Sequence, residues 1–96
     1  MTTDQQQLYR FSVIGQGSFP LPVPGETMLD LADQLGARDA TDLTVSGHVE
    51  GVALEADRRA NSLSTAIASA IEDAEAIGLR VLRIEIEHGE FAEPAA

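Results

Sequence analysis

Residues 61–87 combine two hydrophobic patterns, one directly after the other. In the first part, apolar residues recur three or four positions apart, which places them on one face of a helix. They are Leu63, Ala66, Ile67, Ala70, Ile71, Ala74 and Ile77. Ser62 is placed to cap the start of this helix, and Gly78 to end it. The period then changes to two, as expected of a strand covered on one face. The alternating apolar residues are Leu82, Ile84 and Ile86.

The first half of the chain predicts a strand, a proline-rich connection and a short helix. Residues 8–14 alternate as a strand does, with Tyr9, Phe11 and Val13 on one face. Prolines in the connection exclude a helix there; they are Pro20, Pro22 and Pro24. Residues 27–35 predict a short helix. Thr27 and Asp30 stand at capping-box spacing at its start, and Gly36 is expected to end it.

Residues 43–47 and 52–57 predict two strands joined as a hairpin across residues 48–51. The order β-α-β-β-α-β favours an α+β, ferredoxin-like split βαβ fold, with four antiparallel strands and both helices on one face. Apolar residues of the hairpin would lie beneath the helices: Val52, Leu54 and Ala56. The open face would carry Thr44, Ser46, Glu55, Asp57, Arg83 and Glu85. The pattern leaves open which face the aromatic residues of the first strand take, because a one-residue slip exchanges the two faces.

With 96 residues, the chain predicts one domain. We expect a disordered N-terminus over residues 1–7, a single α+β domain over 8–87, and a frayed C-terminal tail over 88–96. The absence of Cys excludes disulfides and thiolate zinc sites, and it favours a cytoplasmic protein. The sequence shows neither a signal peptide nor an apolar run long enough to span a membrane.

Charge is the second strong property of the sequence. Sixteen acidic residues stand against six Arg, and the formal net charge is −10. Such a surface repels nucleic acids and anionic membranes and favours basic partners. Acidity that merely keeps a small protein soluble is the alternative interpretation.

Short motifs along the chain resemble a family of small bacterial proteins known mainly from sequence. The matching residues are Tyr9, Arg10, Phe11; Asp39, Ala40, Thr41; Asp57, Arg58, Ala60; Ser69, Ala70, Ile71; Asp73, Glu75, Gly78; and Val81, Leu82, Arg83, Glu85. Some relatives carry a downstream helix-turn-helix segment, so the resemblance implies a regulatory or DNA-associated role. This chain ends before such a segment, and it has Ala37 where the family often has Cys. We therefore expect no direct binding to nucleic acid.

No motif predicts catalytic, cofactor-binding or metal-ligating residues. His48 and His88 lie far apart in the sequence, without the spacing of a metal site. Gly15, Gly17 and Ser18 are only weakly similar to a phosphate-binding turn, because prolines follow them and no Lys does. The sequence therefore favours a protein that is not an enzyme.

Five residues are candidates for binding a partner. Glu72, Asp73 and Glu75 are expected on the solvated face of the long helix. Arg58 and Arg59 end the third strand, where a planar guanidinium could bind a carboxylate or phosphate. Alternatively, one of these Arg residues pairs with Asp57 or Glu85 and fixes the turn that follows.

These observations favour a non-enzymatic, acidic interaction or regulatory module of a bacterium. It would bind a basic protein partner or a second copy of itself, with an antitoxin-like or inhibitory role as a sharper form. The alternative is a homodimeric ferredoxin-like domain that senses a small molecule, which rests on fold analogy alone.

Overall fold

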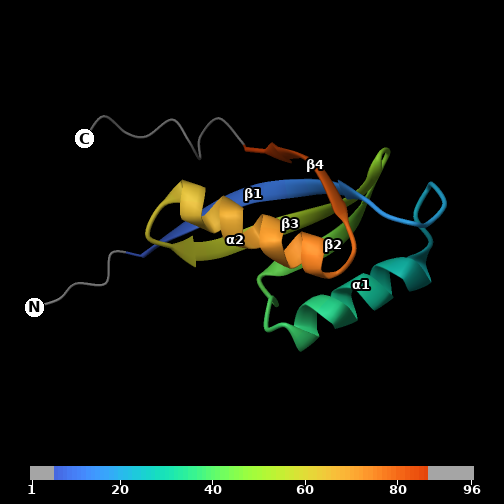
Figure 1. The fold of residues 1–96 in the computed structure, drawn as a ribbon, viewed down its shortest axis with the longest axis horizontal. Coiled ribbons are helices and arrows are strands. Elements are labelled where there is room, and N and C mark those ends of the chain that lie inside the picture. The colour runs from blue at the N-terminus through green and yellow to red at the C-terminus, as the bar shows by residue number, and fades with distance from the viewer. Residues whose placement is uncertain (1–5, 87–96) are drawn as a thin grey trace, which may run out of the picture.

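The computed structural model of the chain describes residues 6–86, which form four strands and two helices (Figure 1). The strands are β1 Gln7–Gln16, β2 Leu43–His48, β3 Gly51–Ala60 and β4 Arg80–Glu85, and the helices are α1 Gly25–Ala37 and α2 Leu63–Ala76. The strands make one antiparallel sheet in the order β2-β3-β1-β4. The predicted α+β, ferredoxin-like fold is therefore confirmed. Within these residues, neither helix is long and apolar enough to cross a membrane.

The predicted disordered N-terminus and frayed tail lie almost entirely outside the described residues. Gln6 and Gln7 are the exceptions, and Gln7 begins β1 and pairs with Ala60 of β3. Its backbone continues the ladder between the two central strands by one residue beyond the apolar pattern.

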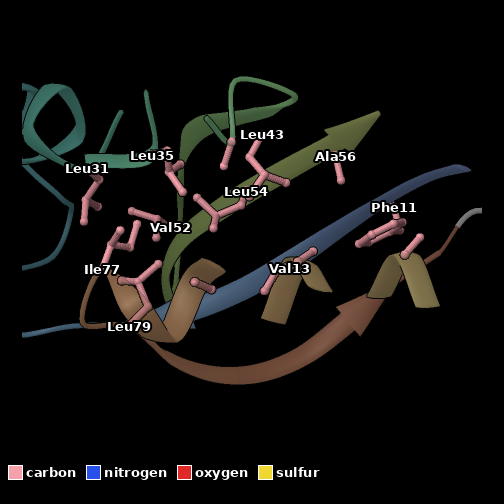
Figure 2. Packing of buried hydrophobic residues seen from close by; sticks show 14 of the residues in the cluster. Phe11, Val13, Leu31, Leu35, Leu43, Val52, Leu54, Ala56, Ile77 and Leu79 are labelled. Carbon is pink, nitrogen blue, oxygen red and sulfur yellow. The ribbon is translucent and has the colours of Figure 1, made fainter. Parts of the chain in front are cut away.

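The aromatic residues of β1 belong to the covered face of the sheet. Tyr9, Phe11 and Val13 are buried in the same cluster as Leu31 and Leu35 of α1. Figure 2 shows Phe11 and Val13 within this cluster, together with residues of both central strands. Because residues of α2 also belong to it, both helices cover one face of the sheet. The sequence pattern did not settle which face of the sheet these β1 residues take, and the structure places them on the face that the helices cover.

Alanines form the innermost face of α2. Ala66, Ala70 and Ala74 are each 0% exposed, and they let the helix lie close to the sheet. Leu63 and Ile67 pack against the core from the helix flank. Ile71 was expected in the central stripe, but it is only half-buried and lies outside the core cluster. Its position one residue after Ala70 turns it to the rim of the buried face.

The end of α2 follows the sequence prediction. Ser62 accepts a hydrogen bond from the Thr65 N–H at 3.1 Å and caps the helix start. Gly78 has φ +91°, and the Leu79 N–H donates to the Ala74 carbonyl at 3.1 Å. This is the Schellman arrangement that a left-handed glycine permits.

Both ends of α1 differ from the sequence prediction. The helix begins directly after Pro24, before Thr27, and no side chain caps it. It also continues through Gly36, and Asp39 takes the left-handed conformation with φ +61°. The Ala40 N–H then donates to the Leu35 carbonyl at 2.9 Å. Proline at the helix entrance and a left-handed Asp at its exit replace the predicted capping box and glycine stop.

A bulge shifts the covered face of β4 by one residue. The pairing of β1 with β4 changes register between Ile14 and Gly15, so that Val81 rather than Leu82 lies opposite Gly15. Val81 packs against the core, together with Ile84 and Ile86. The expectation that Leu82 shares this covered face was wrong, because the irregularity changes the phase of the strand.

Overpacking the alanine face tests this account of the core. Ala70→Leu should destabilise the domain by about 1–3 kcal/mol, because the extra carbons have no space against the sheet. Ala68→Leu is the matched control, since Ala68 is exposed on the same helix. Urea unfolding followed by circular dichroism would measure both. Equal stability of the two variants would contradict the close approach of α2 to the sheet.

Candidate functional site

Arg58 is the one charged side chain that is buried among the described residues, with 9% exposure. It lies opposite Tyr9 in the pairing of β1 with β3, and therefore on the face that the helices cover. Its neighbour Arg59 is exposed. The alternation that turns Ala56 inward also turns Arg58 inward, so a cation lies beneath the helices.

The Arg58 guanidinium binds one carboxylate with two parallel hydrogen bonds. Nε donates to Asp42 Oδ2 at 2.7 Å, and Nη2 donates to Asp42 Oδ1 at 2.8 Å. Nη1 donates to the Ser69 hydroxyl at 3.1 Å, and Ser69 in turn donates to the Ala66 carbonyl at 3.0 Å. The planar fork of arginine matches this carboxylate geometry. The contacts join the start of β2 to β3 and α2.

A second carboxylate extends the cluster to α1. Asp73 Oδ2 lies 2.9 Å from Arg58 Nη2, and Asp73 Oδ1 accepts from Arg38 Nη2 at 2.9 Å. Arg38 is the residue that ends α1. We call Arg38, Asp42, Arg58 and Asp73 the Arg58 network. Its two cations and two anions balance, and within the described residues no buried side-chain nitrogen or oxygen lacks a hydrogen-bond partner.

The electrostatics of the Arg58 network favour its charged form. The hydrogen bond from Arg58 lowers the pKa of Asp42 below its ordinary value, against the opposing effect of burial. The same bond is the largest cause that raises the pKa of Arg58. Both groups therefore keep their charges at neutral pH, and the positive charge of Arg58 is already neutralised. The arrangement suits the joining of several elements, because most N–H groups of Arg58 are bound within the chain.

The structure separates the five sequence candidates into two groups. Arg58 and Asp73 are part of the Arg58 network, whereas Arg59, Glu72 and Glu75 are exposed. Expecting Asp73 on a solvated face was wrong, because its side chain is only 14% exposed. It lies on the flank of α2 that faces Arg58 and Arg38.

The expected partners of Arg58 were also wrong. Asp57 pairs with Arg10 at 3.1 Å, and Glu85 pairs with Arg83 at 3.1 Å. Sequence reasoning missed Asp42 and Ser69 as partners of Arg58, and Arg38 as the second partner of Asp73. One signal was present, since alternation from the buried Val52, Leu54 and Ala56 continues to Arg58.

The predicted polar face of the sheet is confirmed. Thr44, Glu55, Asp57, Arg83 and Glu85 are exposed, and Ser46 is half-buried. A depression of about 340 Å³ lies on this side, lined by Arg10, Phe11, Ser12, Glu55, Ala56, Asp57 and Glu85. An ion pair of 2.6 Å joins Arg83 of β4 to Glu50 in the β2–β3 turn. Its charges, like those of the Arg10–Asp57 pair, are already matched within the chain.

Metal binding has no support within residues 6–86, where no three His, Asp or Glu side chains are grouped to hold an ion. His48 Nδ1 accepts the Glu50 N–H at 3.1 Å and so belongs to the hairpin turn. His88 lies outside the described residues.

The exposed side of the helices carries more acidic charge than its own two Arg residues balance. Figure 1 shows α1 and α2 on one side of the molecule, with α2 across the sheet and α1 beside β2. Six acidic residues on these helices and at the end of α1 are exposed: Glu26, Asp30, Asp33, Asp39, Glu72 and Glu75. Both Arg residues on this side, Arg38 and Arg58, are neutralised in the Arg58 network. The other four belong to the strands: Arg10, Arg59, Arg80 and Arg83.

Comparisons with models of protein families, with curated proteins and with solved structures find no match for this chain.

Removing the central cation tests the Arg58 network. Arg58→Ala leaves Asp42 and Asp73 partly buried without their shared cation, and we expect a loss of about 3 kcal/mol in the free energy of unfolding. Arg59→Ala is the control, because Arg59 is exposed and its removal should change stability by less than about 0.5 kcal/mol. Denaturant unfolding measures both. A small effect of Arg58→Ala would contradict the structural role of the network.

The lowered pKa of Asp42 predicts acid sensitivity. The Asp42 carboxyl binds a proton less readily in the folded state than in the unfolded state. The contribution of ionised Asp42 to the free energy of unfolding is therefore fully present above the ordinary pKa of 3.8. It is lost as pH falls through the lower folded pKa. The stability difference between the wild type and Asp42→Asn should therefore shrink as pH falls from about 5 to about 2. Urea unfolding at a series of pH values measures it, and a constant difference would contradict the prediction.

Proposed function

We propose that the chain is a non-enzymatic interaction module, acting in the bacterial cytoplasm, that binds a basic protein through the exposed side of its two helices. The observation that carries this proposal is the separation of charge. Exposed acidic residues gather on the helices, whereas the cations nearest them are used within the Arg58 network. A surface of one sign attracts and orients a partner of the other sign.

An exposed apolar side chain adds to this surface. Leu29 of α1 is 68% exposed, and it is preceded by Glu26 and followed by Asp30 and Asp33 along the helix. An apolar contact within a charged surround is the usual composition of a protein interface, where burial gives affinity and charges give orientation. An inhibitor or antitoxin-like role would be a specific form of this function, in which the module covers a basic surface of its partner.

The depression on the open sheet face supports the small-molecule alternative less well. Its volume of about 340 Å³ lies at the lower end of the range for ligand sites. Ligand pockets are lined mainly by apolar side chains, however, whereas this one is lined largely by charged residues. Arg10 and Asp57, which pair across it, already satisfy one another.

Neutralising α2 tests the proposal. A tagged chain would be used to capture proteins from a lysate of its native organism, and a stoichiometric basic partner would be identified and its affinity measured. Glu72→Gln with Glu75→Gln should weaken this affinity about 5–30-fold at low salt, at about 0.5–1 kcal/mol for each lost charge pair. High salt should weaken the binding of the partner to the wild type, and it should narrow the difference in affinity between the wild type and the double variant.

The matched control changes net charge by the same two units away from the helices. Glu55→Gln and Glu85→Gln replace exposed residues of β3 and β4 on the open face of the sheet. This variant should retain the partner. Capture of no basic protein, or equal weakening by the two double variants, would refute binding through the helical side.

A further inference from the structure

The free edge of β2 lacks the charges, prolines and bulges that often protect the edge of a sheet. The strand lies at one end of the order β2-β3-β1-β4, and none of its six residues is charged or is proline. Its pairing with β3 runs from Leu43 to His48 without a register shift. Proteins usually protect exposed edges with charges, prolines or bulges, because an open edge pairs with another strand.

The opposite edge of the same sheet is protected. β4 contains Arg80, Arg83 and Glu85, and its pairing with β1 has an irregularity at Ile14 and Gly15. Charges and bulges both oppose the addition of a further strand. The two edges of one sheet therefore differ, and only β2 has the character of a pairing surface among the described strands.

The hydrogen-bond phase of β2 identifies the groups that point outward. The Asp57 N–H donates to the Asp42 carbonyl at 3.1 Å, which makes these two residues a hydrogen-bonded pair. Antiparallel ladders alternate such pairs with non-bonded ones. The backbone N–H and C=O groups of Thr44, Ser46 and His48 therefore point to β3. The backbone groups of Val45 and Gly47 then point to the free edge.

The edge is open to solvent at Gly47. This residue is exposed, and because it has no side chain, the exposed atoms are those of its backbone. A Cβ added there would meet only Val23, at 3.9 Å. Thr44 is also exposed. A partner strand can therefore approach β2 at its Gly47 end.

Charge determines which strand would pair there. α1 packs against β2 and carries the exposed Glu26, Asp30 and Asp33, with no basic residue along its length. Antiparallel pairing of β2 with β2 of a second copy would bring two such acidic helices together. Like charges across an interface oppose association, whereas a basic segment would be attracted by the same helix.

We propose that β2 binds an extended segment of a basic protein by strand addition, with the segment's cationic side chains next to α1. This inference rests on the proposed function, since it specifies how the basic partner is held. Main-chain hydrogen bonds to Val45 and Gly47 would supply general affinity, and alternate side chains would supply selectivity.

Amide hydrogen exchange with a defined peptide tests the proposal. The probe is acetyl-Arg-Thr-Arg-Thr-Arg-Thr-amide, added to the 15N-labelled chain at low salt. At saturation, exchange at the Val45 and Gly47 amides should slow at least tenfold. The Ser46 and His48 amides are internal controls, because their bonds to β3 exist without the peptide and their exchange should change little.

An equally charged Arg-Pro repeat peptide separates strand addition from attraction by charge. Proline cannot donate a ladder hydrogen bond, so this peptide should not slow exchange at Val45 or Gly47. If the Arg-Thr peptide shifts resonances of α1 but leaves these two amides unprotected, strand addition is overturned while binding through the acidic helices stands. Protection that appears without peptide and grows with protein concentration would instead assign the edge to a second copy.

A proline variant gives an independent measurement with the captured partner. Val45→Pro removes an N–H that no bond to β3 uses, so the hairpin should remain folded. We expect partner binding to fall at least tenfold, whereas Val45→Thr should retain it. Unchanged binding by a folded Val45→Pro variant would overturn strand addition. Loss of binding only in the Glu72→Gln, Glu75→Gln variant would leave the proposed function intact.

Discussion

The two-carboxylate pairing of Arg58 is the interaction on which the arrangement of the other elements depends. A cation on the covered face of β3 must be matched, because an unpaired buried charge costs several kcal/mol. Asp42, just before β2, and Asp73 of α2 provide the match, and Arg38 extends it to the end of α1. The positions of α1 and α2 at this end of the sheet are thereby linked through charge as well as through apolar packing.

Neutralisation within this network also determines the surface. Arg38 and Arg58 are the cations on the helical side, and Asp42 and Asp73 neutralise them, so within residues 6–86 the exposed acids of both helices have no Arg partner. On the open sheet face the charges are matched by neighbours, as in the pairs of Arg10 with Asp57 and of Arg83 with Glu50. The two sides of one small domain therefore differ in electrostatic character, and the helical side carries the larger excess of exposed acidic charge.

The edge of β2 complements this surface. Electrostatic attraction by α1 acts over several ångströms and has little directional preference, whereas ladder hydrogen bonds at Val45 and Gly47 act at contact and define a register. Together they describe recognition in two stages, in which charge concentrates a basic segment beside β2 and the backbone then fixes it. The charged, bulged edge at β4 would confine such pairing to one side of the sheet.

The sequence by itself determined the order of elements, the fold class, the end of α2 at Gly78 and the polar character of the open face. These depend on local periodicity and turn chemistry, which each segment carries in its own residues. Tertiary structure decided the partners of Arg58 and the position of Ile71 at the rim of the core. It also decided that Val81, and not Leu82, lies on the covered face of β4. Those outcomes depend on which distant segments meet and in what register, and local patterns contain no such information. The alternation of β3 did contain the burial of Arg58, but only the packed structure showed that Asp42 and Asp73 lie close enough to neutralise it.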